Sequence, residues 1–200
     1  MSPFTTLTAV AVPLDLANVD TDQIIPARFL GLTRAEQAGA LFNDLRRDAE
    51  GHPRPDFALN RPAYAGAGIL VADRNFGCGS SREHAVTVMV DNGLRAFVAP
   101  SFGDIFHNNC FQNGVLPVRL VPERVAELRA LLRERPGATM TIDLVHRTVL
   151  GPDGREDAFE IDPFRRDCLL EGVDDLGLTL CHEAQIAVFE AWRRTQPDWP

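Results

Sequence analysis

Three short apolar runs, separated by two helix-like segments, occupy the middle of the chain. The runs AGILVAD (67–73), RAFVAP (95–100) and VLPVRL (115–120) are nearly continuous in apolar residues, which is typical of strands buried on both faces of a sheet. The segments between them, from about 81 to 92 and from about 103 to 112, each end just before a glycine. This succession requires parallel strands with helical crossovers. It predicts an α/β fold with a parallel βαβ core.

The flanking segments extend this core. LTAVAVPL (7–14) predicts a first strand, 33–48 carries apolar residues at helical spacing, and 49–66 holds three prolines and predicts a surface loop. A helix is expected at 122–135, followed by antiparallel strands in 138–150 and near 158–161, around a turn at 151–154. We expect a single domain over residues 1–200, with a C-terminal helical extension over about 163–194.

Composition narrows the classes of partner and of cofactor. The net charge of −8 argues against binding to nucleic acid or to an anionic membrane surface. No signal peptide or long apolar run is visible, so we expect a cytoplasmic protein without a membrane span. The four cysteines contain no C-x-x-C pair, and we expect no metal site on this chain.

The segment RNFGCGSSREHAV (74–86) concentrates the chemically active residue types of the chain. A glycine-rich loop between a buried parallel strand and a helix presents free backbone N–H groups to an anion, and Arg82 adds a fork suited to a carboxylate. A simpler role also fits, because Ser80 and Glu83 match a capping box at a helix start. The loop matches neither a phosphate-binding P-loop nor a dinucleotide-binding fingerprint.

The two roles are compatible. Serine is too weakly acidic to act as a base at neutral pH unless its alkoxide is stabilised. Helix-end N–H groups and a neighbouring arginine provide that stabilisation. The residues alone therefore predict a binding site for a carboxylate.

Four stretches together resemble a known family. GSSREHA (79–85) is similar to the active-site serine motif of the aconitase superfamily, in its swivelling C-terminal domain. NVDTDQIIPARFL (18–30), APSFGDIFHNNCFQNGVLPV (99–118) and DDLGLTL (174–180) resemble the small subunits of 3-isopropylmalate dehydratase. The resemblance implies a swivelling β/β/α domain of the aconitase C-terminal type, with a mixed sheet and flanking helices.

It also implies an activity and a partner. The reaction would interconvert 2-isopropylmalate and 3-isopropylmalate by dehydration and rehydration, in leucine biosynthesis. A [4Fe-4S] cluster would be carried by a separate large subunit, with none bound by this chain. The substrate is a small hydroxy-dicarboxylate, and the chain alone would be inactive.

The resemblance assigns roles to residues by position. Ser80 would be the base that removes and returns the carbon-bound proton, while Ser81 and Arg82 would bind a substrate carboxylate. Asp22 would be a second active-site residue, and Asp20 is a weaker candidate. The segment 26–30 mixes one cation with apolar side chains, as a substrate with carboxylates and an isopropyl group requires. The substrate-binding candidates there are Arg28, Phe29 and Leu30, of which the last two are alternatively core residues.

Other polar residues receive structural roles in this interpretation. They are Cys78, His84, His107, Asn108 and Asn109. The chain departs from the family at Val86, where proline is usual, and at His107, where tyrosine is common. Two alternatives therefore stay open: a related hydro-lyase acting on 2-methylmalate, citraconate or homoaconitate, and a non-catalytic carboxylate-binding module. The helix at 181–194 has one apolar face with Ile186, Phe189 and Trp192, and we expect that face to dock on the body of the chain, with a partner surface as the alternative.

Overall fold

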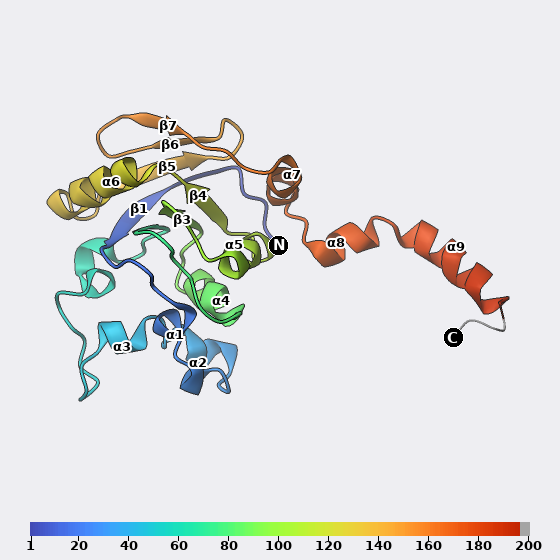
Figure 1. Cartoon of the computed structure of the whole chain (residues 1–200), viewed down its shortest axis with the longest axis horizontal. Helices are drawn as coiled ribbons and strands as arrows, with labels where there is room; N and C mark the ends of the chain where they lie inside the picture. The colour runs from blue at the N-terminus through green and yellow to red at the C-terminus, as the bar shows by residue number, and fades with distance from the viewer. Residues whose placement is uncertain (197–200) are drawn as a thin grey trace.

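A seven-stranded mixed sheet forms the centre of the described chain. The computed structural model describes residues 1–196. The strands lie in the order β4-β3-β2-β1-β5-β6-β7 (Figure 1). Their bounds are β1 Thr6–Leu14, β2 Ile69–Ala72, β3 Ala96–Ala99, β4 Leu116–Arg119, β5 Thr139–Asp143, β6 Thr148–Leu150 and β7 Glu156–Ala158. The first four strands pair in parallel and the rest antiparallel, so the predicted parallel core is confirmed.

Alternate residues of the parallel strands divide between two apolar cores, one on each face of the sheet. Leu70 and Phe97 pack with α4 (His84–Asp91) and α5 (Asp104–Gln112). Ile69 and Val98 point the other way and pack with α6 (Pro122–Glu134) and with the antiparallel strands. The side chains of both strands are fully buried, which explains their continuous apolar runs. The helices therefore cover both faces, with α6 opposite α4 and α5 (Figure 1).

The helix expected at 33–48 is wrong as a single element. The structure has α2 (Arg34–Ala38) and α3 (Asn43–Arg46), separated at Gly39 and at Phe42, whose φ of 51° is left-handed. The Phe42 N–H donates to Ile24 O at 2.8 Å, and the Phe42 ring is fully buried. This tertiary contact outweighs the local helical periodicity. The short elements nearby are α1 (Thr21–Ile24), η1 (Ala27–Phe29), η2 (Ala58–Asn60) and η3 (Pro62–Tyr64).

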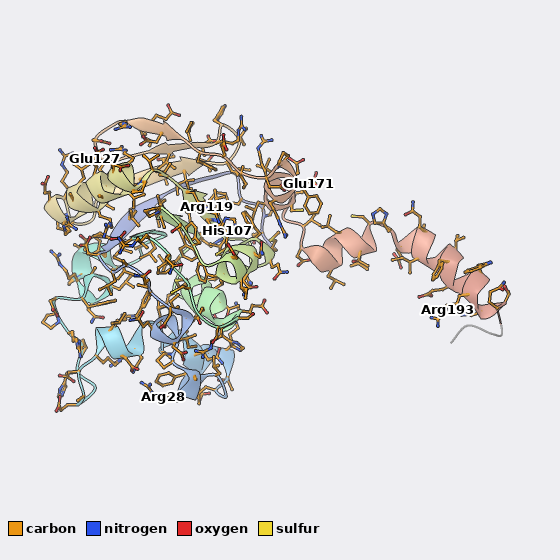
Figure 2. The ribbon with its side chains drawn as sticks, viewed as in Figure 1. Arg28, His107, Arg119, Glu127, Glu171 and Arg193 are labelled. Carbon is orange, nitrogen blue, oxygen red and sulfur yellow. The ribbon has the colours of Figure 1, made fainter. Side chains whose placement is uncertain are left out.

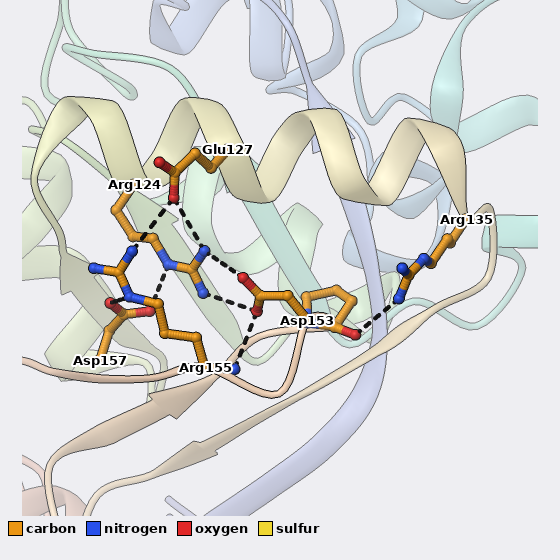
Figure 3. Close-up of polar contacts among 7 residues, drawn as sticks. Arg124, Glu127, Arg135, Asp153, Arg155 and Asp157 are labelled. Atoms are coloured by element: carbon orange, nitrogen blue, oxygen red, sulfur yellow. Dashed lines mark hydrogen bonds and ion pairs between the residues drawn. The ribbon is translucent and has the colours of Figure 1, made fainter.

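A buried arginine ties α6 to the hairpin of β6 and β7 (Figure 3). The side chain of Arg124 is only 2% exposed, and its Nη1 lies 2.8 Å from Asp153 Oδ2 while its Nε lies 2.6 Å from Asp157 Oδ2. Glu127 on the same helix adds a third carboxylate, at 3.2 Å. Hydrogen bonds from Arg124 lower the pKa of Asp153 to about 2. Because three carboxylates surround the buried guanidinium of Arg124, its positive charge is compensated.

Of the three C-terminal helices, the first packs on the body through the buried Leu169 and the other two extend away from it. They are α7 (Pro163–Glu171), α8 (Asp175–Leu180) and α9 (Glu183–Arg194), and α8 and α9 extend away from the sheet (Figure 1). No residue of α9 is buried, and Phe189 and Trp192 are about half exposed, at 51% and 49%. The expectation that this apolar face docks on the body is wrong. In the described residues, no helix has the length and apolar character to cross a membrane.

Candidate active site

The loop that follows β2 is held against the segment that follows β1. Asn18 N donates to Arg74 O at 2.9 Å, Gly77 N to Val19 O at 2.7 Å, and Thr21 N to Cys78 O at 2.9 Å. β1 and β2 are parallel neighbours, so both segments leave the sheet at the carboxyl ends of their strands. Open α/β sheets place their ligands at this edge. The two segments with the most specific sequence signals therefore meet at the expected place.

Glycine is required where the loop crosses α5. Gly77 has a φ of 72°, and a β-carbon placed on it would lie 2.6 Å from both Cδ atoms of Phe106. A β-carbon on Gly103, at the start of α5, would lie 2.5 Å from Gly77 O. The backbones of the two loops are thus in direct contact, with the buried Phe106 ring below them. This packing determines the path of the chain into Ser80.

The predicted capping box of Ser80 and Glu83 is wrong. Helix α4 begins at His84 with Glu83 in the N-cap position, and the Glu83 carboxylate instead accepts a hydrogen bond from Asn113 Nδ2 at 3.2 Å. Ser80 O accepts from Thr21 Oγ1 at 3.0 Å, which ties the loop to α1. Within the described residues, the N–H groups of 80–84 donate to no acceptor. Ser80 and Ser81 are exposed beside these donors.

Asp22 and Arg82 form a two-bond ion pair. Arg82 Nη1 donates to Asp22 Oδ1, and Arg82 Nη2 donates to Asp22 Oδ2 at 2.8 Å. Arg82 Nη1 also lies 3.5 Å from Ile25 O. The hydrogen bond from Arg82 lowers the pKa of Asp22 below its ordinary value, so Asp22 is ionised at neutral pH. The Arg82 side chain is 15% exposed and that of Asp22 is 53% exposed, so the pair lies at the surface of the loop.

The segment after Asp22 is less closely tied to the loop. Arg28 pairs with Asp44, and its guanidinium lies over the Phe29 ring at 4.6 Å from the centroid. Figure 2 shows Arg28 at the outer edge of the molecule, beside α2. Phe29 and Leu30 are partly buried against the core on the α4 side. Their roles in substrate binding stay a prediction.

The remaining candidates have separate surroundings. Asp20 caps α1 by accepting from Gln23 N at 2.7 Å. Cys78 Sγ donates to Asn18 O at 3.4 Å, and burial raises the pKa of this thiol, which disfavours the reactive thiolate. His84 is exposed, while the His107 ring packs against Phe111 at 5.1 Å between centroids.

Thr21 is a residue that sequence reasoning missed. Its N–H donates a hydrogen bond to Cys78 O, and its hydroxyl donates one to Ser80 O. One residue therefore fixes the loop on either side of Gly79. Thr21 is buried, whereas Asp20 is half-buried and Asp22 is exposed. The only available signal was its position between Asp20 and Asp22.

The described residues contain no group of three or more His, Cys, Asp or Glu side chains able to hold a metal ion. Cys78, Cys110, Cys168 and Cys181 form no disulfide bond. The donor set of the described chain therefore does not fit an iron–sulfur cluster, which requires several thiolates around one centre.

Comparison with known proteins identifies the family. The family described as the aconitase C-terminal domain matches residues 1–123, and the one described as LeuD_N matches 126–163. The 3-isopropylmalate dehydratase small subunits of Paramagnetospirillum magneticum and Gluconacetobacter diazotrophicus are 52% and 51% identical to this chain over 200 residues, covering all of this chain and 100% and 97% of theirs. A crystal structure of 3-isopropylmalate dehydratase (leuD) from Methanocaldococcus jannaschii matches with a TM-score of 0.67 and 25% identity, covering 91% of this chain and 98% of that one. The chain belongs to the family of 3-isopropylmalate dehydratase small subunits, within the aconitase superfamily.

Proposed function

We propose that this chain supplies the proton-transfer and carboxylate-binding half of an isopropylmalate dehydratase site. The reaction interconverts 2-isopropylmalate and 3-isopropylmalate by dehydration and rehydration, as a step of leucine biosynthesis. The observation that carries the proposal is the exposed Ser80–Arg82 corner, where unpartnered N–H groups, two hydroxyls and a guanidinium converge. The full-length similarity to dehydratase small subunits supports the same activity.

Ser80 is the proposed base. In its alkoxide form, its side-chain oxygen takes the proton from one substrate carbon as the neighbouring carbon loses its hydroxyl as water; on rehydration it gives the proton to that neighbouring carbon, and water returns the hydroxyl to the first. The N–H groups of residues 80–84 stabilise the negative charge on this oxygen while the proton is absent from it. Thr21 holds Ser80 O, so the serine stays fixed relative to the segment of Asp22.

Arg82 is the proposed carboxylate-binding residue, and Asp22 is its positioning partner. Asp22 occupies the end of the guanidinium through Nη1 and Nη2. The edge formed by Nε–H and the second Nη2–H is left for a substrate carboxylate, which it binds with two parallel hydrogen bonds. Ser81 precedes Arg82 and is exposed, and its hydroxyl is the second proposed carboxylate-binding group. Asp22 thereby orients the arginine without blocking the edge that binds the substrate.

The segment of Arg28, Phe29 and Leu30 is the proposed determinant of the substrate side chain. Phe29 and Leu30 are only partly buried, so each leaves apolar surface that an isopropyl group can contact. An apolar pocket discriminates between alkyl groups by about 1–3 kcal/mol per methylene, so this segment sets a preference rather than an absolute choice.

The site is incomplete on this chain, and we propose that a large subunit completes it. A [4Fe-4S] cluster, which we assign to the large subunit, would supply Lewis-acid chemistry at the leaving hydroxyl, since the described residues of this chain include no group of side chains able to hold a metal. The four cysteines form no disulfide, which suits a reducing compartment, and the cytoplasm is the proposed location.

Reconstitution tests the proposed function. The full chain is assayed alone and with a cluster-bearing large subunit under anaerobic conditions, with isopropylmalate, 2-methylmalate and homoaconitate as substrates. We expect turnover only in the complex, with the highest kcat/KM for isopropylmalate. A higher kcat/KM for one of the other acids would reassign the substrate. Tight binding of isopropylmalate by the chain alone, with no turnover in the complex, would favour a carboxylate-binding module.

A further inference from the structure

A cavity lies at the β4 edge of the sheet, apart from the candidate site, since residues 74–83 do not line it. Its volume is about 450 Å³, which falls within the range of small-molecule sites. It is bounded by α5, by the edge strand β4 and by the segment that leads into α7. Figure 2 shows His107 and Arg119 close together in this part of the molecule.

Charges of both signs face this cavity without pairing. Arg119 and Arg165 line it together with Glu160 and Asp162. Among the described residues, no ion pair joins any of these four side chains to another or to a third residue. Asp162 accepts from Arg165 N at 3.0 Å as the cap of α7, and the Arg165 guanidinium lies 5.7 Å from the centroid of the Phe111 ring. Opposite charges around one cavity, held apart, complement a ligand that carries both charges.

His107 contributes a neutral polar group. Its ring packs between Phe102 and Phe111, at 5.8 Å and 5.1 Å between centroids. The pKa of His107 is lowered to about 4, mainly by burial of the ring. The nearby cations Arg119 and Arg165 also lower it, and the nearby Asp104 opposes them in part. The imidazole is therefore uncharged at neutral pH and offers one hydrogen-bond donor and one acceptor. Because His107 adds no charge, the two arginines and the two carboxylates leave the lining with no net charge. This disfavours the binding of a dianion.

The rest of the lining is apolar. Phe111, Pro117 and Ile161 supply aromatic and aliphatic surface beside the charged groups. We propose that this cavity binds a small aliphatic α-amino acid. Its carboxylate lies against Arg119 and Arg165, its ammonium against Glu160, and its side chain against the apolar wall. The proposal does not depend on the proposed reaction, because none of its residues has a role there.

Isothermal titration of the full chain at pH 7.5 tests this site. The ligands are L-valine and L-leucine, with 4-methylpentanoate and 3-methylbutan-1-amine as analogues of leucine that lack the ammonium or the carboxylate. We expect saturable binding of the amino acids and binding of each analogue weakened about tenfold or more, since each loses one charge-assisted contact. In NMR spectra, the ring resonances of His107 should shift on saturation with leucine.

Variants locate the binding. Arg119→Gln and Glu160→Gln should each weaken leucine binding about tenfold or more. Arg194→Gln and Glu123→Gln make the same charge changes at exposed positions outside the cavity and should leave the affinity within about twofold. Absence of saturable binding up to roughly 20 mM would overturn the proposal. So would equal binding of leucine and its two analogues, or unchanged affinity in both cavity variants.

Discussion

Gly77 is the position where one added carbon tests how the reactive loop is held. A β-carbon there would lie 2.6 Å from two atoms of the Phe106 ring, whereas ordinary contacts of a β-carbon begin near 3.4 Å. The ring is 1% exposed and packs edge-on against Phe76 at 5.3 Å between centroids, so it cannot move aside freely. Gly77→Ala must therefore shift either the loop or α5.

The cost has two parts that a matched control separates. Alanine at a φ of 72° costs about 1–2 kcal/mol in backbone strain. Overpacking against a fixed ring adds about 1–3 kcal/mol. Gly154 has a similar φ of 79° and nothing within 4 Å of the added carbon, so Gly154→Ala carries the strain alone. We expect Gly77→Ala to be less stable than Gly154→Ala by about 2 kcal/mol.

Urea unfolding at fixed protein concentration measures this difference, and turnover by the complex measures the displacement of Ser80. A shift of about 1 Å at a reacting group lowers the rate about a hundredfold, so Gly77→Ala should lose activity while Gly154→Ala keeps it. The double variant Gly77→Ala/Phe106→Ala removes the Cγ and Cδ atoms that the added carbon would meet and should recover part of the turnover. Equal stability of the two alanine variants would refute the role of the Phe106 contact.

Three further predictions concern the ion pairs and the C-terminal tail. Arg124→Met should lower the free energy of unfolding by about 3 kcal/mol, which is the lower end of the range for a broken buried ion pair. The lower end is expected because Asp157 still has Arg155 as a partner, at 3.1 Å. Arg124 holds the pKa of Asp153 at about 2, so the stability that this ion pair contributes to the wild type should be lost as the pH falls from about 4 to 2. The variant lacks the pair and should show no such loss, so equal acid unfolding curves would contradict this. Asp22→Asn should lower kcat/KM at least about tenfold in the complex, mainly through KM, with an unchanged melting temperature; a normal KM would remove Asp22 from substrate positioning. Removal of residues 182–200 should change the melting temperature of the isolated chain by less than about 2 °C, because α9 buries no side chain; calorimetry showing a larger drop would reveal docking on the body.

The parallel core was predictable because its strands are buried on both faces. That burial imposes continuous apolar runs such as those around Leu70 and Phe97, and glycines end the crossover helices. The antiparallel pairing of β5 with β1 depends on partners far apart in the chain, and the local pattern does not encode it. The swivelling fold followed from the family resemblance of long motifs.

The site was predictable as a set of residues but not as an arrangement. Ser80 and Glu83 have the spacing of a capping box, yet Ser80 is bonded instead to Thr21 of α1, 59 positions away, and α4 begins only at His84. The pairing of Asp22 with Arg82 crosses 60 positions and has no local signal. The exposed α9 face also escaped prediction, because amphipathic spacing shows that a helix has an apolar face and does not show what covers it.

The most direct test of the central claim is proton exchange in the Ser80→Ala variant. The variant is assembled with the large subunit, and both turnover of isopropylmalate and incorporation of solvent deuterium at carbon are measured, with Ser81→Ala as the matched control. Loss of a general base lowers the rate about 10²–10⁴-fold. We predict that Ser80→Ala loses turnover and deuterium incorporation together while the complex still assembles, and that Ser81→Ala mainly raises KM. Deuterium incorporation at the wild-type rate in Ser80→Ala would contradict the assignment of Ser80 as the base.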